Sequence, residues 1–157
     1  MSASPDANDR PYGTGDASFR AAGGEEGLRA LVTDFYELMS TRDFARRIRD
    51  MHPSDLDVSI DKLARFLCGW LGGPKRYAER YGPIRLPRAH AHLPIDADDR
   101  DAWLRCMALA IARQPWDDAF KTYLLGALRV PAERIRAVCE EGRGGGAGGG
   151  RGRCSAG

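Results

Sequence analysis

The sequence predicts a single all-α domain of about five helices. Apolar residues recur at steps of three and four in several separate segments, which is the spacing of one face of an α-helix. No segment shows the alternation of apolar and polar residues that is typical of a half-buried β-strand. The chain has 157 residues, of which 43% are hydrophobic, and this suits one core in one domain.

The two ends differ in composition from the middle of the chain. Residues 1–18 are rich in Ser, Asp, Gly and Pro and predict a disordered leader. Residues 142–157 consist mostly of Gly and Arg and predict a flexible tail. This tail lacks the aromatic residues that stack on bases, so it does not indicate nucleic-acid binding. The predicted folded domain is therefore residues 19–141.

The first predicted helix follows Gly23-Gly24. Its apolar face consists of Leu28, Leu31, Val32, Phe35 and Met39, and Tyr36 lies at the edge of this face. A short helical stretch around Phe44 and Ile48 comes next. It ends at His52, because Pro53 disfavours helical backbone in the residue before it.

A second amphipathic helix follows this turn. Its apolar residues are Ile60, Leu63, Phe66, Leu67, Trp70 and Leu71. Gly72-Gly73-Pro74 ends it abruptly. Tyr77 and Tyr81 predict one or two further helical turns, after which three prolines make any helix short or irregular.

Asp98 and Asp99 predict the start of the next helix, because acidic side chains favour the positive end of a helix. Its apolar face consists of Trp103, Leu104, Met107, Ala110 and Ile111. The last predicted helix carries Phe120, Tyr123, Leu124, Ala127 and Leu128, and Ile135, Val138 and Cys139 close the domain after Pro131.

Charge and cysteine content exclude several classes of protein. The 24 basic and 22 acidic residues are interspersed, and a net charge of +2 indicates no strong field for nucleic acid. The four cysteines form no C-x-x-C pair, so free thiols are expected, with Cys68 and Cys106 buried and inert. No apolar run stands near the amino terminus, so a cytoplasmic protein without a signal peptide or membrane span is expected.

The candidate site lies in the proline-rich connection. His90 and His92 stand a residue apart there, and Trp103 follows on the next predicted helix. An imidazole at a helix end beside apolar surface is the geometry that ligates a haem iron. The H-x-H pair also fits a zinc or nickel site, whose third ligand would come from Asp96, Asp98 or His52.

Four segments together resemble the truncated haemoglobins of group II. They are AAGGEEGLRALVTDFYELM, MHPSDLDVS, KLARFLCGWLGGPKRYAERYG and RAHAHLPIDADDRDAWLRCM, and they extend through the whole predicted domain. The resemblance implies a two-over-two helical sandwich around haem b. It also implies that the fifth ligand of the iron is the histidine thirteen residues before the helix tryptophan, which is His90.

The family's proximal segment commonly reads arginine-histidine and then proline-phenylalanine. Here Ala89 precedes His90, and Ala91-His92-Leu93 follows it. The resemblance implies a distal pocket formed by Tyr36, His52, Ser59, Leu63, Phe66 and Trp103. The expected haem contacts are Leu67, Tyr81, Leu86, Arg88, Ile95 and Met107, with Arg88 pairing with a haem propionate.

Several of these residues are hydrogen-bond donors toward a diatomic ligand: the indole N–H of Trp103, the hydroxyl of Tyr36 and a protonated nitrogen of His52. If each contributes about 1–1.5 kcal/mol of net hydrogen bonding, oxygen release slows by about two to three powers of ten. A protein that releases oxygen so slowly is a poor carrier. The sequence therefore raises redox chemistry as an alternative to plain storage.

The leading hypothesis is a haem b protein that binds dioxygen and other diatomic ligands reversibly. The alternative is an enzyme that removes nitric oxide or peroxide, by nitric oxide dioxygenase or peroxidase-like activity, with an external electron donor. A third hypothesis is a non-haem helical domain that senses a metal or acts as a scaffold. No nucleic-acid or membrane partner is expected, and both a monomer and a homodimer are compatible with the sequence.

Overall fold

The computed structural model describes residues 11–83 and 93–149, with side chains as far as residue 141. In chain order the elements are α1 (Ala17–Ala21), α2 (Gly24–Thr41), the 3-10 turn η2 (Asp43–Ala45), α3 (Arg46–Asp50), α4 (Asp57–Trp70), α5 (Arg76–Tyr81), α7 (Ala97–Ala112) and α8 (Asp118–Gly149). Within these two ranges the structure contains no β-strand. The predicted all-α class is therefore confirmed.

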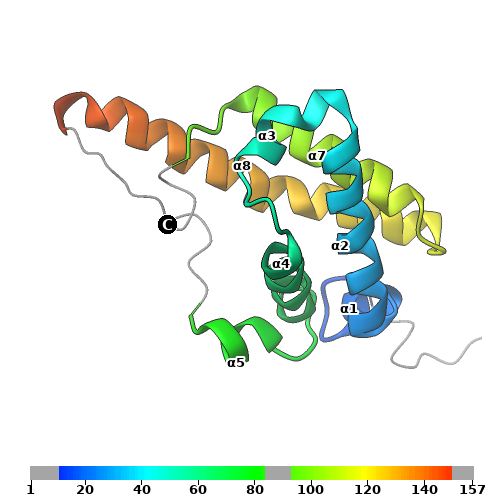
Figure 1. Cartoon of the computed structure of the whole chain (residues 1–157). Helices are drawn as coiled ribbons and strands as arrows, with labels where there is room; N and C mark the ends of the chain where they lie inside the picture. Colours follow the sequence, from blue (N-terminus) through cyan, green and yellow to red (C-terminus); the bar gives the residue numbers. More distant parts are fainter. Residues whose placement is uncertain (1–10, 84–92, 150–157) are drawn as a thin grey trace, which may run out of the picture.

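The four longest helices form two pairs around one core. α2 packs against both α4 and α7, and α7 lies beside α8 (Figure 1). The apolar faces predicted from the spacing meet in this core. Its largest fully buried side chains include Phe35, Phe120, Leu28, Leu31, Leu38, Met39, Leu67, Met107, Leu124 and Leu128. The arrangement is the two-over-two sandwich that the resemblance implied.

The end of α4 packs closely against residues near the start of the described chain. A Cβ on Gly72, which has φ +95, would lie 1.9 Å from the carbonyl oxygen of Gly15, and a Cβ on Gly73 would lie 2.5 Å from the ring of Phe19. The glycines that end α4 therefore also permit this contact.

Residues 11–18, which the sequence assigns to the leader, contact the core in the structure. The ring of Tyr12 packs against those of Phe120 and Tyr123, at 5.2 Å between centroids in both cases. Ser18 is buried on α1 and its hydroxyl oxygen accepts a 2.9 Å hydrogen bond from the backbone N–H of Gly13. The boundary of the domain stays a prediction.

α8 continues through Pro131 as one helix, and its carboxyl-terminal part extends beyond the start of α7 (Figure 1). A proline inside a helix removes one backbone hydrogen bond and costs about 3 kcal/mol. Glu133 supports the helix just after this point, because its carboxylate contacts Arg100 of α7 and Arg136 of α8, both at 2.5 Å. Hydrogen bonds from Arg136 and Arg100 lower the pKa of Glu133 to about 2.

The predicted burial of Cys68 and Cys106 is confirmed. Burial raises the pKa of the Cys106 thiol to about 11, so the thiol stays protonated and unreactive at neutral pH. Among the helices that the structure describes, none has both the length and the apolar character needed to cross a lipid bilayer.

Candidate functional site

Four aromatic rings form a continuous series that joins α7, α2 and the turn after α3. The ring of Trp103 packs edge-on against Phe35 at 5.2 Å between centroids, and Phe35 packs in the same way against Tyr36 at 4.9 Å. The ring of Tyr36 then meets that of His52 at 5.5 Å. The series therefore contains three residues that were predicted to share a pocket, Tyr36, His52 and Trp103. Phe35 connects Trp103 to Tyr36.

The Tyr36 hydroxyl is a buried donor that makes no hydrogen bond with any described residue. The residue is only 6% exposed, and burial raises the pKa of its hydroxyl above the usual value. A buried donor without a partner costs about 1–3 kcal/mol. Such groups are rare in native proteins, and each calls for a partner from outside the protein, such as a ligand or an ordered water.

The indole N–H of Trp103 also has no hydrogen-bond partner within residues 11–83 and 93–149. Its side chain is half-buried on α7, against the core. Two donors, one phenolic and one indole, thus reach the series of rings from different helices. This combination fits a pocket for a small ligand that accepts hydrogen bonds.

His52 is held by the end of α3. Its Nδ1 lies 2.8 Å from the carbonyl oxygen of Ile48, and its backbone N–H donates to the carbonyl oxygen of Arg49 at 3.0 Å. Because a carbonyl oxygen only accepts, Nδ1 carries the proton and Nε2 of the neutral ring is an acceptor. Donation from Nε2 therefore requires the imidazolium form.

Arg49 fixes the turn that contains His52, and sequence reasoning did not identify this role. Its Nε donates to the hydroxyl of Ser40 on α2 at 3.0 Å, and its two terminal nitrogens donate to the carbonyl oxygens of Pro53 and Ser54, also at 3.0 Å. One guanidinium group thus ties the turn after α3 to the end of α2.

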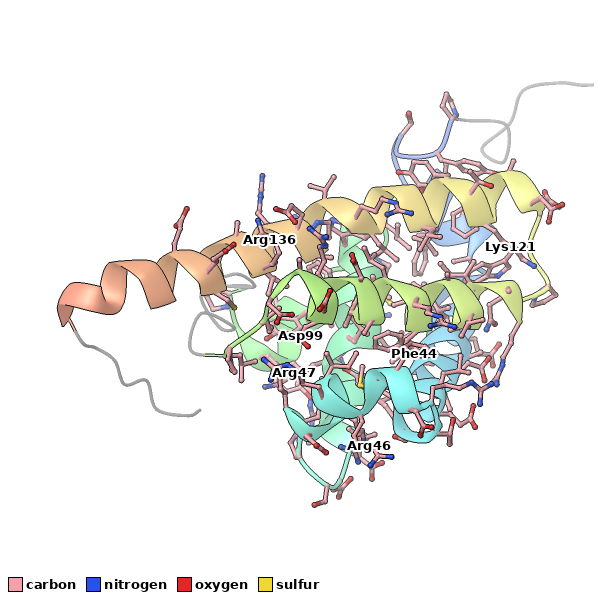
Figure 2. The ribbon with its side chains drawn as sticks, turned by 90° about the horizontal axis from the view of Figure 1, so that it is seen from above. Phe44, Arg46, Arg47, Asp99, Lys121 and Arg136 are labelled. Carbon is pink, nitrogen blue, oxygen red and sulfur yellow. The ribbon has the colours of Figure 1, made fainter. Side chains whose placement is uncertain are left out.

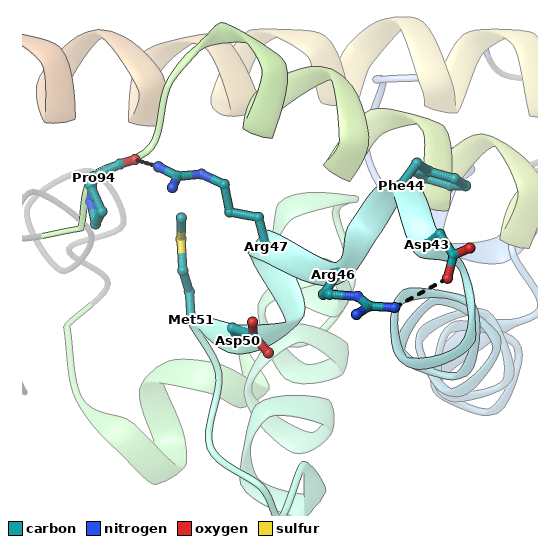
Figure 3. A pocket seen from close by; sticks show the side chains of 7 residues that line it. All are labelled: Asp43, Phe44, Arg46, Arg47, Asp50, Met51 and Pro94. Carbon is teal, nitrogen blue, oxygen red and sulfur yellow. Dashed lines mark hydrogen bonds and ion pairs between the residues drawn. The ribbon is translucent and has the colours of Figure 1, made fainter.

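A second arginine on α3, Arg47, forms a bidentate pair with Asp99 of α7. Its Nε lies 2.9 and 3.0 Å from the two carboxylate oxygens, and Figure 2 shows the two residues beside each other. Its Nη2 donates to the carbonyl oxygen of Pro94 at 2.6 Å (Figure 3). Asp99 is 3% exposed, so this carboxylate is a buried charge with an arginine partner.

The start of α7 depends on a reciprocal pair of aspartates. The Asp96 side chain accepts the backbone N–H of Asp99 at 2.9 Å, and the Asp99 side chain accepts that of Asp96 at 3.1 Å. This capping box satisfies two backbone donors that a helix start leaves unpaired. The sequence predicted a helix start at Asp98 and Asp99, whereas the pairing of Asp99 with Arg47 depends on the tertiary structure.

The α4 residues predicted for the distal pocket lie along one helix. Ser59 and Leu63 are half-buried, whereas Phe66 is buried and stacks on Trp70 at 6.0 Å between ring centroids. Leu67 of α4 and Met107 of α7, predicted as haem contacts, are fully buried in the core. Ile95 is half-buried just before the start of α7.

Tyr81, also predicted as a haem contact, directs its hydroxyl at Asp61 of α4, with a donor–acceptor distance of 2.6 Å. The same carboxylate accepts from Arg29 at 2.6 Å and from Arg65 at 2.9 Å. Burial favours a higher pKa for Asp61, but the hydrogen bonds from Tyr81, Arg29 and Arg65 outweigh it and hold the pKa well below its usual range. Asp61 is therefore a charged hub that joins α5, α4 and α2.

The remaining predicted residues, His90, Leu86 and Arg88, lie outside the described residues, as does His92. Within the described ranges no three His, Cys, Asp or Glu side chains are grouped closely enough to hold a metal ion. Asp96, one candidate third ligand for a zinc or nickel site, is engaged in the capping box.

A surface hollow of about 540 Å³ lies between η2, α3 and the segment before α7 (Figure 3). It is lined by Asp43, Phe44, Arg46, Arg47, Asp50, Met51 and Pro94. None of these residues was predicted for the pocket, and most carry charges. The hollow is therefore a mostly charged surface feature, whereas the series of rings is aromatic.

Two helix pairs around one core, with one buried and one half-buried donor in a series of rings, are features of a small helical protein of the globin class. Residues 17–135 match a family model described as bacterial-like globin. The chain belongs to this family, and it is a truncated haemoglobin of group II.

Similar proteins agree in sequence and in structure. The group 2 truncated hemoglobin YjbI of Bacillus subtilis (strain 168) is 34% identical over 112 residues, which cover 71% of this chain and 83% of that protein. A group II 2-on-2 hemoglobin from Agrobacterium tumefaciens superposes with a TM-score of 0.72 at 35% identity, covering 76% of this chain and 92% of that one. A truncated oxygen-avid haemoglobin from Bacillus subtilis superposes with a TM-score of 0.68 at 34% identity, covering 75% and 97%.

Family membership confirms the predicted cofactor, which is haem, with haem b as the usual form in globins. The described residues fit this group, because the partnerless Tyr36 hydroxyl and Trp103 indole N–H lie among apolar side chains. The chain is therefore a haem globin that binds small ligands.

Proposed function

We propose that this globin binds dioxygen reversibly, with His90 as the protein ligand of the haem iron and Tyr36, Trp103 and His52 facing the bound molecule. The buried Tyr36 hydroxyl, which has no partner among the described residues, carries this proposal. Haem, when bound, supplies an iron with one coordination position open to a diatomic ligand. The protein supplies the surroundings of that position.

In this proposal Tyr36 and Trp103 are the hydrogen-bond donors to the ligand at neutral pH. The phenol and the indole are both donors at neutral pH, because a raised pKa keeps Tyr36 neutral and indole does not titrate. Each donor retains a ligand that carries partial negative charge by about 1 kcal/mol, or about fivefold in the dissociation rate. Carbon monoxide is less polar and gains less.

The main role of His52 in this proposal is to orient the side chains of the pocket. Its Nδ1–H is engaged by the carbonyl oxygen of Ile48, so the other nitrogen donates only when the ring is protonated. Its edge-on contact with Tyr36 restricts the phenol ring. Ser59, Leu63 and Phe66 complete the distal wall in this proposal.

On the proximal side we propose His90 rather than His92, on the resemblance and on its thirteen-residue distance from Trp103. The further haem contacts in the proposal are Leu67, Tyr81, Leu86, Arg88, Ile95 and Met107, with Arg88 beside a propionate. A cytoplasmic location is part of the same proposal.

The pair of donors supports a second candidate function. Two hydrogen bonds to the ligand slow its release, and slow release suits the removal of nitric oxide or peroxide better than transport. The Bacillus subtilis relative described as oxygen-avid agrees with slow release in a protein of this kind. This activity requires an external electron donor. Turnover with a defined reductant separates the two functions, since a carrier forms a stable oxygen complex and shows no sustained consumption.

The absorption spectrum of the hemin-loaded chain tests the proximal assignment. His90→Ala should abolish the Soret band of a histidine-ligated haem, and His92→Ala should leave it intact. The two variants are matched controls, since they remove the same side chain two residues apart. The reverse outcome would assign the iron to His92, and a colourless wild-type chain would overturn the proposal.

A further inference from the structure

Arg47 and Asp99 connect α3, which leads into the turn with His52, to α7, which carries Trp103. Asp99 lies four residues before Trp103 on α7, which is one helical turn, and Arg47 lies on α3, five residues before His52. The bidentate contact at 2.9 and 3.0 Å therefore lies close along the chain to both pocket residues. Figure 2 shows that it spans the space between α3 and α7.

Loss of Arg47 would be costly, because Asp99 is buried. Its side chain is 4% exposed, whereas that of Arg47 is 56% exposed. Among the described ion pairs of Asp99, Arg47 is the one cationic partner. A buried carboxylate that loses its guanidinium group keeps its desolvation penalty without compensation. The Asp99 end is further fixed by the capping box with Asp96.

Arg47 also fixes the backbone just before α7. Its Nη2 donates to the carbonyl oxygen of Pro94 at 2.6 Å (Figure 3). Its Nε contacts the carboxylate of Asp99 at the same time. One rigid guanidinium group thus holds both the first turn of α7 and the segment that leads into it. A lysine ammonium lacks the fork that makes both contacts at once.

The ring contacts and the Arg47–Asp99 ion pair together link α7, α2 and α3 to one another. The ring series runs from Trp103 on α7 through Phe35 and Tyr36 on α2 to His52 after α3. Arg47 and Asp99 link α3 directly back to α7. The separation of His52 and Trp103 is therefore set from two sides. Hydrogen bonds weaken steeply with small changes in length and angle, so this separation affects how well donors hold a ligand.

We propose that Arg47 is a positioning residue of the ligand pocket: by binding Asp99 and Pro94 it fixes the spacing of His52 and Trp103, and so sets the dissociation rate of a diatomic ligand. The inference rests on the proposed function, because it concerns the same pocket. Arg47 itself acts through Asp99, and its role is to hold α3 and α7 together.

The neighbouring Arg46 is a matched control. Its side chain is 75% exposed and reaches the exposed Asp43 at 3.4 Å, away from α7 (Figure 3). Arg46→Ala and Arg47→Ala remove the same group from adjacent positions on one helix. A general effect of losing a positive charge on α3 would appear in both variants.

The experiment measures oxygen dissociation and the stretching frequency of bound carbon monoxide in the full-length, hemin-loaded variants. Arg47→Ala should raise the dissociation rate about threefold to tenfold and broaden or split the carbon monoxide band, since the donors take several positions. Arg46→Ala should match the wild type in both measurements. An unchanged rate together with a single unshifted band in Arg47→Ala would overturn the proposal.

Two further variants separate positioning from folding. Arg47→Lys retains a charge near Asp99, should fold, and should give an intermediate rate because it cannot also hold Pro94. Full restoration by lysine would overturn the role of the guanidinium fork. In a Trp103→Phe background, Arg47→Ala should change the rate less than it does in the wild type. An equal change in both backgrounds would show that Arg47 acts independently of Trp103, against the proposal.

A haem-free measurement distinguishes this proposal from failure of the proposed function. The indole ¹H–¹⁵N resonance of Trp103, assigned by its loss in Trp103→Phe, should shift or broaden in hemin-free Arg47→Ala and stay in place in Arg46→Ala. If the wild-type chain binds no haem, the proposed function fails and this resonance still decides whether Arg47 positions Trp103. No change in the resonance would overturn that role.

Discussion

The ring series and the surroundings of Asp61 differ in whether their polar groups have hydrogen-bond partners. Asp61 accepts hydrogen bonds from Tyr81, Arg29 and Arg65, so its charge is fully compensated. The Tyr36 hydroxyl is more deeply buried and has no partner among the described residues. The difference teaches that the described residues satisfy the Asp61 carboxylate but leave the Tyr36 hydroxyl without a partner, at the place where the proposed function puts a ligand.

The comparison predicts opposite effects on stability and on ligand binding. A partnered donor stabilises the fold, whereas a donor reserved for a ligand destabilises the empty protein and stabilises the complex. Removal of donors from each region therefore tests the comparison directly.

The largest effect is expected on oxygen dissociation. Trp103→Phe should raise the rate about fivefold to tenfold, and the double variant with Tyr36→Phe should raise it by a further factor of similar size. Stopped-flow displacement of oxygen by carbon monoxide measures these rates. Trp116→Phe is the control, because that ring packs on Phe120 rather than on the ring series. Equal rates in Trp103→Phe and the wild type would mean that the indole does not reach the ligand.

A smaller effect is expected on the unfolding free energy of the hemin-free protein. Tyr81→Phe should lower it by about 1.5 kcal/mol, since a charged acceptor loses one donor, whereas Tyr36→Phe should raise it by up to about 1 kcal/mol. Urea denaturation followed by circular dichroism measures both changes.

Tyr77→Phe is the control on the same helix as Tyr81. Its ring packs against that of Tyr81 at 5.1 Å, and its hydroxyl makes no hydrogen bond to a described residue, so little change is expected. If Tyr36→Phe destabilised the protein as much as Tyr81→Phe, the hydroxyl of Tyr36 would have a structural partner and the contrast would be lost.

The smallest effect is expected in the pH dependence of stability. The folded pKa of Asp61 is lowered, so its contribution is fully present above its unfolded pKa of about 3.9 and is lost as the pH falls further. The folded pKa of Tyr36 is raised, so its contribution is fully present below an unfolded pKa of about 10 and is lost as the pH rises further. The two regions therefore titrate at opposite ends of the pH scale.

Unfolding free energies of hemin-free variants test these two windows. Asp61→Asn should flatten the loss of stability below pH about 4, and Tyr36→Phe should flatten the loss above pH about 10. Each variant serves as the control for the other window. A profile for Asp61→Asn that runs parallel to the wild type in acid would show that Asp61 gains nothing from its three donors.

Local patterns predicted the main helices well. α2, α4 and α7 occupy the segments indicated by apolar spacing, and α4 ends at the predicted glycines. α8 is the exception, since it passes through Pro131 without ending. Contacts of α8 with α7, including that of Glu133 with Arg100, offset the hydrogen bond lost at the proline, and such contacts cannot be read from local sequence.

For the candidate site, too, some residues were predicted from the sequence and others were not. Tyr36, His52 and Trp103 were predicted from the resemblance, and in the structure they form one series of rings with Phe35. The arginines that support the pocket were missed. Arg47 and Arg49 stand in a segment with several other arginines, and no spacing rule indicates which of them will meet a buried carboxylate or a turn.

The sequence by itself determined which faces of the helices are buried and where α4 ends, because these features depend on residues within a few turns of each other. It also determined the family. Only the tertiary structure decided that Arg47 meets Asp99, 52 residues away, and that the Tyr36 hydroxyl makes no hydrogen bond to a described residue. With 24 basic and 22 acidic residues, long flexible side chains have many pairings of similar energy, and the packing of α3 against α7 selects one of them.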